Sequence, residues 1–235
     1  MLANICQNVV RSSGSITTGY ALYLDAGDAT SNTGSGATWY DLSGNGSDVT
    51  WNGGYGRGGS GSTAYFTLDG SSGTYANRTG LSFTGTTGTF SIWVYYTTTG
   101  NGYYMFQAAS DYHKQLVLAA SGNSLYWQGC LVNPTYTWNM SSNVAATGGL
   151  WFNHVGTWDG TTVNLYINGV LAATTAQLAN IGGPTTPLSI GSLPVAWGYA
   201  GALNGRIAKV LVYTTALTGA ELLSNYNADK ARYGY

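Results

Sequence analysis

The carboxylates of this sequence are the first residues that could carry out chemistry. Glycoside hydrolysis needs two of them, one protonated and one ionised, on either side of the bond that breaks. The chain has one glutamate, Glu221, and its aspartates stand singly at positions 25, 28, 41, 48, 69, 111, 159 and 229. Glu221 follows Thr218 by three residues, which is the spacing of a helix capping box. The sequence therefore predicts no catalytic carboxylate pair and no enzyme.

Nucleophiles with a positioned base are also missing from the sequence. The two histidines, His113 and His154, lie in no hydrolase or protease signature. His154 falls within a predicted strand, where a structural role is favoured, and His113 lies in a polar segment. The two cysteines, Cys6 and Cys130, are too far apart for a short metal-binding spacing. They are either two free thiols or a disulfide that ties the N-terminal segment to the body, and we expect no catalytic residue.

The aromatic residues are the remaining candidates for ligand binding. The chain has 8 Trp and 19 Tyr, and most of the tryptophans lie in predicted strands, where core packing is expected. The segment from Trp197 to Ala200 differs, because it has the composition of a loop between Pro194 and the last predicted strand. Trp197 and Tyr199 are therefore the predicted ligand-binding residues, for a glycan or a neighbouring subunit. The alternative is that they form a lid over the core.

The charge content excludes several classes of protein. Only 8 Lys and Arg and 9 Asp and Glu occur among 235 residues, and the net charge is −1. A disordered chain would carry more charge and fewer aromatics, and a nucleic-acid-binding protein would be basic. No apolar run reaches the roughly 18 residues of a membrane helix. We expect no nucleic-acid and no membrane partner.

The surface predicted by this composition is polar but nearly uncharged. Between Gln115 and Gly205 the only charge is Asp159. A neutral polar surface is easily desolvated, so it suits a protein that neighbours cover or one that binds uncharged ligands such as sugars. A plain sandwich with a neutral surface is the alternative.

Hydrophobic periodicity predicts strands along most of the chain. Alternating or short apolar segments occur at residues 20–26, 64–70, 89–97, 103–109, 115–120 and 124–129. The 89–97 segment is apolar on both faces, as in a central strand, with Trp93 and Tyr95 opposite Phe90, Ile92, Val94 and Tyr96. Residues 131–149 have a less regular pattern.

The end of the chain carries the clearest local signals. Residues 150–175 predict a three-stranded antiparallel meander, because Asp159-Gly160 and Asn168-Gly169 both suit tight primed turns. The one good helix begins at the Thr218 capping box, and its apolar stripe includes Leu222.

Four segments, taken in order, resemble a known family. They are Leu22–Asp25 with Gly34–Gly46, Phe66–Gly70, the Trp151–Val170 meander, and Leu203–Tyr213 with Ala216–Gly234. Over roughly residues 20–235 the chain resembles the concanavalin A-like jelly rolls of the laminin G/pentraxin-like kind, in the form found in tailed-phage virion proteins. The resemblance implies an all-β, two-sheet antiparallel jelly-roll sandwich with one short C-terminal helix. Residues 1–19 would be an N-terminal arm and residues 20–235 the laminin G-like domain.

The resemblance also raises the question of calcium, which relatives often hold with acidic residues after the Asp-Gly of the second segment. Here serine and glycine follow Asp69, whereas a calcium site usually needs about six to eight oxygens and more than one carboxylate. Asp41 and Asp69 are the best remaining candidates, and we expect each to cap a turn. We therefore predict no metal and no cofactor.

The resemblance implies a non-enzymatic structural protein of the virion, as a capsid decoration or fibre module. The arm contains a short apolar stretch with Ile5, Val9 and Val10, which cannot bury itself and would bind a partner. The expected partners are other virion proteins and copies of the chain in a closed dimer or trimer. Alternatively, the arm pairs with an edge strand of its own sandwich.

Two other functions stay open. The first is a glycan-binding adhesin that recognises a cell-surface glycan. The second is a degenerate glycoside hydrolase, because the resemblance extends to hydrolases with the same fold.

Overall fold

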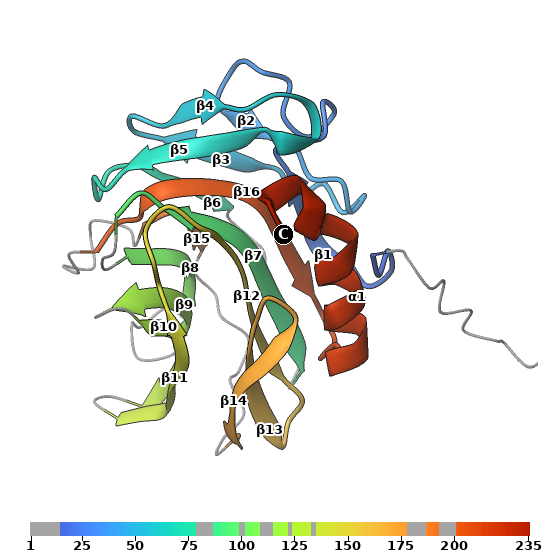
Figure 1. The fold of residues 1–235 in the computed structure, drawn as a ribbon, viewed down its shortest axis with the longest axis vertical. Helices are drawn as coiled ribbons and strands as arrows, with labels where there is room; N and C mark the ends of the chain where they lie inside the picture. The colour runs from blue at the N-terminus through green and yellow to red at the C-terminus, as the bar shows by residue number, and fades with distance from the viewer. Residues whose placement is uncertain are drawn as a thin grey trace, which may run out of the picture.

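The computed structural model describes residues 15–78, 87–98, 102–108, 115–121, 124–132, 135–177, 187–192 and 201–235. These residues form two antiparallel sheets that face each other, with one α-helix near the C-terminus (Figure 1). The predicted fold class is therefore confirmed. In the described part of the chain, no helix is both long and apolar enough to cross a membrane.

The first sheet carries the helix on its outer face, and we call it the helix-side sheet. Its strands run in the order β14-β13-β12-β7-β16-β5-β4, and β1 also pairs with β16. In that order they span Val170–Ala176, Thr162–Ile167, Trp151–Trp158, Gly88–Tyr96, Asn204–Tyr213, Tyr65–Asp69 and Gly56–Gly58, with β1 at Tyr20–Asp25. The strands β7 and β16 lie in the middle of this sheet, which explains why both faces of residues 89–97 are apolar.

The second sheet has the order β11-β10-β9-β8-β15-β6-β3-β2. Its strands span Thr135–Ala145, Ser124–Val132, Gln115–Ser121, Gly102–Ala108, Leu188–Ile190, Tyr75–Arg78, Val49–Asn52 and Thr38–Trp39. The long strand β11 occupies the segment whose sequence is less regular. Its pairing with β10 shifts register at three places, so the two strands do not keep a continuous one-to-one pairing.

The core lies between the two sheets and is rich in aromatic rings. Phe90, Ile92, Val94 and Tyr96 all face it, as their alternation predicts. Trp127 of the second sheet lies against β12 at Gly156, where a Cβ would come within 2.5 Å of the indole. The glycine at this position therefore makes room for the tryptophan.

The predicted meander is confirmed as β12, β13 and β14, but its two turns differ. Asn168 (φ 52°) and Gly169 (φ 76°) both adopt positive φ, as a tight primed turn requires. At the other turn only Gly160 has positive φ, and Asp159, Gly160 and Thr161 form a three-residue loop. The Asp159 carboxylate accepts hydrogen bonds from the backbone N–H groups of Thr161 and Thr162. These bonds close the longer loop and hold the pKa of Asp159 below its usual range.

The helix α1 spans Gly219–Asp229 and is followed by a 3-10 turn, η3, at Lys230–Tyr233. The predicted capping box is present, since Thr218 accepts from the N–H of Glu221 and the Glu221 carboxylate accepts from the N–H of Thr218. Leu222 packs on Leu211 and Val155 of the helix-side sheet. In Figure 1 the helix lies beside β1 and β16, so it covers only part of the outer face of this sheet.

Candidate functional site

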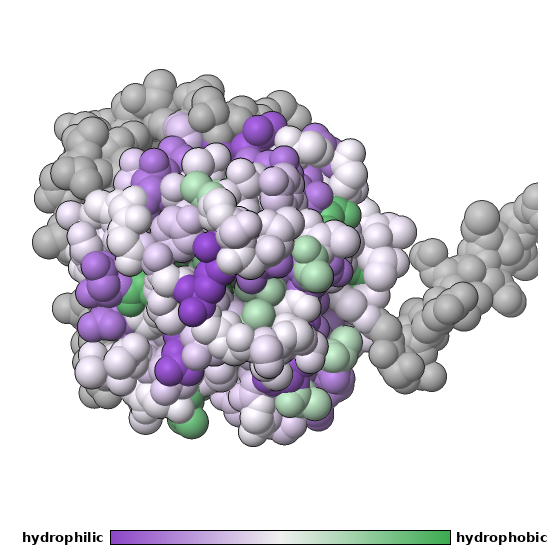
Figure 2. Space-filling view, turned by 90° about the horizontal axis from the view of Figure 1, so that it is seen from above, coloured by the Kyte–Doolittle hydropathy of each residue, from purple (hydrophilic) through white to green (hydrophobic). Residues whose placement is uncertain are grey.

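The ligand-binding residues predicted from sequence, Trp197 and Tyr199, lie outside the described residues. The predicted partner-binding residues of the arm, Ile5, Val9 and Val10, also lie outside them. The described surface is mostly weakly polar, with strongly hydrophilic side chains in small separate groups on the face shown in Figure 2. Two features stand out on this surface, a cluster of aromatic rings around an arginine and a small hollow.

The cluster lies on the outer face of the helix-side sheet and consists of Tyr65, Tyr95, Trp151 and Arg206. We call it the aromatic–arginine cluster. Each member points outward because the next residue along its strand, or the one before it, fills the core, as Phe66, Val94, Phe152 and Ile207 do. Arg206 lies opposite Tyr95 in the β16–β7 register, and Tyr95 lies opposite Trp151 in the β7–β12 register. Strand pairing thus brings together four residues that are far apart in the sequence.

The geometry of the cluster places the arginine between two rings. The guanidinium carbon of Arg206 lies 4.6 Å from the centre of the Tyr65 ring and 4.3 Å from that of Tyr95. The Trp151 ring lies 5.5 Å from Tyr95 and 6.0 Å from Tyr65. All four side chains are half-buried. The rings stabilise the cation through their negative faces and still leave part of their surface to solvent.

Residues beside the cluster are fully buried by the C-terminal segment. The Tyr233 ring stacks on Trp93 with centres 4.1 Å apart, and both side chains are buried. Tyr233 also lies 5.0 Å from Trp151. The C-terminal segment therefore ends against the cluster and supports one side of it.

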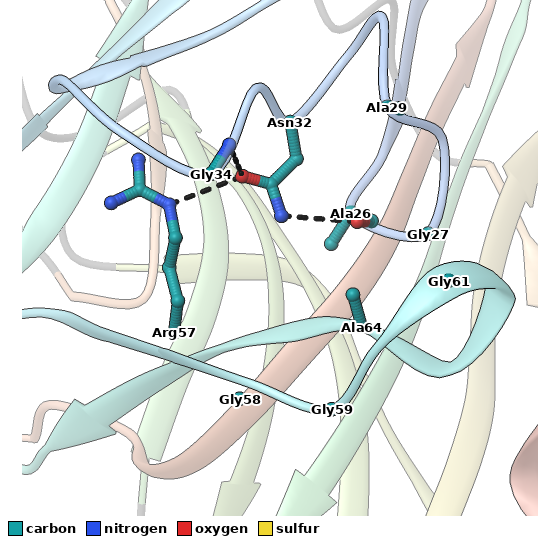
Figure 3. Close-up of a pocket in the computed structure, with 10 residues that line it drawn as sticks. All are labelled: Ala26, Gly27, Ala29, Asn32, Gly34, Arg57, Gly58, Gly59, Gly61 and Ala64. Atoms are coloured by element: carbon teal, nitrogen blue, oxygen red, sulfur yellow. Dashed lines mark hydrogen bonds between the residues drawn. The ribbon is translucent and has the colours of Figure 1, made fainter.

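The hollow opens at the edge of the same sheet, between the loop after β1 and the segment from β4 to the 3-10 turn η1 at Gly61–Thr63 (Figure 3). Its volume is about 300 Å³, at the lower end of the range for small-ligand sites. Its walls are mostly small residues, Ala26, Gly27, Ala29, Gly34, Gly58, Gly59, Gly61 and Ala64, with Asn32 and Arg57 supplying the polar side chains.

The polar side chains of the hollow hold its own walls together. Arg57 donates from Nε to Asn32 Oδ1 at 3.1 Å and from Nη2 to the carbonyl of Gly36 at 2.6 Å. Asn32 Nδ2 donates to the carbonyl of Ala26 at 3.0 Å (Figure 3). These bonds tie the loop after β1 to the edge strand β4. The main role of Arg57 and Asn32 is thus to brace this loop, and a ligand would meet mostly glycine backbone.

The hollow and the cluster adjoin each other at one residue. Gly58 is a wall of the hollow, and the Tyr65 ring lies against it, since a Cβ at Gly58 would come within 2.6 Å of that ring. Glycine at this position lets Tyr65 lie flat on the edge strand.

Two buried carboxylates belong to ion pairs. Arg232 contacts Asp25 at 2.6 Å and Asp229 at 3.3 Å, and Lys209 Nζ lies 2.8 Å from Asp229. The side chains of Lys209, Asp25 and Asp229 are nearly inaccessible to solvent. These four charged side chains carry two charges of each sign, and they hold the C-terminal segment on the sheet. The Asp25 and Asp229 side chains are thus engaged in contacts within the protein.

The two calcium candidates cap turns, as expected. The Asp41 carboxylate accepts from the backbone N–H groups of Tyr23, Ser43 and Ser47, and that of Asp69 accepts from Ser71 at 2.9 Å. Among the residues that the structure describes, no three His, Cys, Asp or Glu side chains gather into a metal site.

His154 lies in the core, and its Nδ1 contacts the hydroxyl of Tyr104 on the facing sheet. Burial lowers the pKa of His154 to about 3, so the ring is neutral at physiological pH. This placement confirms the structural role that its position in a strand favours.

Comparison with known protein families identifies the fold independently. The sequence profile of the concanavalin A-like lectin/glucanases superfamily, of the laminin G type, matches residues 61–223, which is more than half of the chain. A search of curated protein sequences finds no match to this chain.

Solved structures with a similar fold include bacterial toxin domains and a domain of a glycosidase. The binding domain of Paraclostridial Mosquitocidal Protein 1 is 16% identical with a TM-score of 0.71, over 90% of this chain and 52% of that one. The receptor-binding domain of botulinum neurotoxin type G is 16% identical with a TM-score of 0.66, over 89% and 51%. This chain thus spans about half the length of these toxin domains.

The third comparison spans both chains almost completely. Domain 4 of AbnA, a GH43 extracellular arabinanase from Geobacillus stearothermophilus whose structure was determined with arabinotriose, is 17% identical with a TM-score of 0.65, over 88% of this chain and 98% of that domain. At these identities the likeness is one of fold. The matching profile, the two-sheet topology and the C-terminal helix agree, and the chain belongs to the concanavalin A-like lectin/glucanase superfamily.

Proposed function

We propose that this domain binds glycans through the aromatic–arginine cluster and does not hydrolyse them. The observation that carries the proposal is that Tyr65, Tyr95 and Trp151 stay half-buried on a sheet face that α1 leaves partly open. Where this protein uses tryptophan for packing it buries the ring, as it does Trp93 and Trp158, which are 2% and 1% exposed. The open part of the cluster rings is flat and apolar, which suits the C–H face of a sugar ring.

Polar groups beside the aromatic–arginine cluster would form hydrogen bonds with the hydroxyls of such a sugar. Thr67 is opposite Arg206 in the register of β16 and β5, and its side chain is on the same outer face. Asn204, two residues before Arg206, is exposed. Uncharged hydroxyl and amide groups lose little free energy on desolvation compared with charges, which favours a neutral polar ligand.

Two of the similar folds are consistent with this proposal. The arabinanase domain was determined in complex with arabinotriose, and the botulinum neurotoxin domain is named for receptor binding. These are properties of those proteins, and they support glycan binding here only through the shared fold.

The absence of hydrolysis is a separate part of the proposal. Each described carboxylate already has a partner that suits a structural role. Asp25 and Asp229 form ion pairs, Glu221 caps the helix, and the remaining described aspartates, Asp28, Asp41, Asp48, Asp69 and Asp159, accept hydrogen bonds within loops and turns.

Binding and hydrolysis are tested together on a panel of immobilised glycans and soluble polysaccharides. We expect the wild type to bind at least one glycan and to release no reducing sugar. Trp151→Ala should weaken binding by about tenfold or more, as loss of a central aromatic does. Tyr40→Ala is the control, because Tyr40 is 41% exposed and follows β2 in the second sheet. Failure to bind any glycan, or equal binding by the Trp151 variant, would overturn the proposal.

We further propose that the domain is displayed on a virion, attached by its arm to other virion proteins and to copies of itself, and that the glycan belongs to a cell surface. The motifs that resemble tailed-phage proteins and the scarcity of charge support this context. Immunogold labelling of purified particles with an antibody to residues 20–235 tests it. Labelled particles are the expected result, and particles that lack the protein would leave a free adhesin as the function.

A further inference from the structure

Arg206 differs from Lys209 and Arg232, the other two cations on the outer face of this sheet, in having no anionic partner. Lys209 and Arg232 both form ion pairs with Asp25 and Asp229. Among the described residues, no carboxylate lies within ion-pair distance of Arg206, and its guanidinium donates no hydrogen bond. Its contacts are the faces of Tyr65 and Tyr95.

A half-buried guanidinium loses part of its hydration shell. Contacts with two ring faces compensate for this loss only in part, because they form no hydrogen bonds with the guanidinium. A cation–π contact uses none of the five N–H donors of Arg206. On the neighbouring strand, Asp69 lies opposite Asn204 and not opposite Arg206, and its carboxylate accepts from the N–H of Ser71. The sheet therefore presents an unneutralised charge beside open aromatic rings.

We propose that the ligand of the cluster is an acidic glycan, whose sugar carboxylate binds Arg206 while the ring of the same sugar stacks on Trp151 or Tyr95. This inference rests on the proposed glycan-binding function and adds the class of sugar. A carboxylate matches the planar fork of the guanidinium and would accept two of its N–H groups. The flanking tyrosines hold the guanidinium in place before the ligand arrives, which lowers the entropy lost on binding.

The charge of the molecule favours a single carboxylate over a polyanion. A nucleic acid or a highly sulfated polymer is held by several cations along its length. Here the net charge is −1, and the cluster holds one cation. One anionic group on an otherwise neutral sugar fits one arginine among uncharged residues.

Matched pairs of sugars isolate the carboxylate. Methyl glucuronide and methyl glucoside differ at one carbon, and methyl galacturonide and methyl galactoside form a second pair. Titration calorimetry, or NMR where binding is weak, would compare each pair. We expect at least one uronide to bind about tenfold more tightly than its neutral partner, a difference of about 1.4 kcal/mol, because its carboxylate accepts charge-assisted hydrogen bonds from the guanidinium. Raising the salt concentration should reduce this difference.

Variants then assign the preference to one residue. Arg206→Gln should abolish the preference for the uronide, and Arg206→Lys should keep only part of it, because lysine lacks the planar fork. Arg57→Gln removes the same charge at the hollow and should keep the preference. Near-ultraviolet circular dichroism of each variant would verify the fold.

The outcomes separate this inference from the proposed function. If neutral sugars bind and depend on Trp151, but uronides bind no more tightly, the domain binds glycans and the acidic class is wrong. If the preference survives in Arg206→Gln, or vanishes equally in Arg57→Gln, Arg206 is not its source. If no uronide binds at all, the inference is overturned whichever ligand the domain has.

Discussion

The hydrogen bonds of His154 determine its tautomer. The Tyr104 hydroxyl donates to the carbonyl of Ala119 at 3.0 Å, so it accepts from Nδ1–H of His154. Nε2 then carries no proton, and it has no hydrogen-bond partner in the structure. A proton on Nε2 would put a charge into an apolar core, which is why burial lowers the pKa to about 3.

This histidine should make the protein less stable in mild acid. The unfolded chain protonates the residue below about pH 6.5, whereas the folded chain does so only near pH 3. The unfolded state therefore binds more protons in this window, and the free energy of unfolding falls as the pH drops through it. The slope reaches about 1.4 kcal/mol per pH unit for one proton.

Urea unfolding at several pH values between about 7 and 5 measures that slope before most carboxylates titrate. His154→Gln should lower the stability at neutral pH but flatten the slope. His113→Gln serves as the control for the loss of a histidine. Equal slopes for wild type and His154→Gln would show that this residue does not set the acid sensitivity.

The role of a residue could be predicted from the sequence where its hydrogen-bond partners lie nearby in the chain. The caps made by Asp69 and Glu221, and the bond from Ser43 to Asp41, involve neighbours two or three residues away, so the residue types already indicate them. The aromatic–arginine cluster was missed because its members lie on four strands that only the sheet register brings together. The apolar second face of residues 89–97 was the one available signal, since it placed Tyr95 outside the core.

At the scale of elements, the turn between β13 and β14 also contacts the helix. Gly169 has a φ of +76°, and a Cβ there would lie 3.1 Å from side-chain atoms of both Leu223 and Tyr226. Gly169→Val should therefore lower stability through backbone strain and through displacement of α1. The strain alone costs about 1 to 2 kcal/mol for an L-residue.

A second glycine separates the two effects. Gly149 has a φ of +86° and open space around its Cβ position, so Gly149→Val carries the strain without the contact. Thermal melts should give a larger loss for Gly169→Val than for Gly149→Val. Equal losses would mean that the contact with α1 contributes nothing.

The buried ion pairs attach the C-terminal segment to the sheet. Lys209→Met should cost about 3 to 5 kcal/mol, because it leaves the two buried carboxylates of Asp25 and Asp229 with one cation, Arg232, between them. The double variant Lys209→Met with Asp229→Leu restores charge balance around Asp25 and Arg232, and should recover part of the loss. Urea unfolding of the wild type, the two single variants Lys209→Met and Asp229→Leu, and the double variant forms a double-mutant cycle. Additive losses would contradict a direct pairing of Lys209 with Asp229.

Elements with strong local signals were predicted well, and the strand with repeated register shifts was not. The meander and the helix follow from two turn signals and a capping box, which act locally. The strand β11 was not recognised because its sequence pattern is less regular, and its pairing with β10 shifts register at three places. The loop at Asp159-Gly160 was expected to be tight, but threonine hydroxyls and N–H groups that bind the aspartate stabilise a longer one.

On the scale of the whole molecule, the charges are few, and four of them are gathered in one set of ion pairs. In the described part of the chain, the ion pairs are those of Asp25, Lys209, Asp229 and Arg232, beneath the C-terminal segment. Most of the surface shown in Figure 2 is weakly polar, which the pale colours indicate. A single half-buried arginine without an anionic partner can therefore dominate the local potential, which is why Arg206 is expected to select the charge of a ligand.

The start of the described chain is fastened to the helix. Ile16 N–H donates to Asn225 Oδ1 at 2.6 Å, and Ser15 Oγ donates to the same oxygen at 3.1 Å. The Tyr213 hydroxyl donates to the carbonyl of Ile16 at 3.2 Å. Residues 15 and 16, which belong to the predicted arm, thus contact the folded domain, and a deletion that tests the arm should end before them.

Two deletions distinguish an assembly element from a stabilising one. Removing residues 1–14 keeps the contacts with Asn225, so the protein should keep its melting temperature and its glycan binding. If the arm joins the domain to neighbours, this protein should fail to enter particles or to form its oligomer, which particle purification and light scattering would measure. Removing residues 1–18 also takes away Ser15 and Ile16 and leaves the buried Asn225 amide oxygen unpaired, which costs about 1 to 3 kcal/mol and should lower the melting temperature. Normal assembly of the shorter deletion would show that residues 1–14 do not anchor the domain, and would favour the free adhesin.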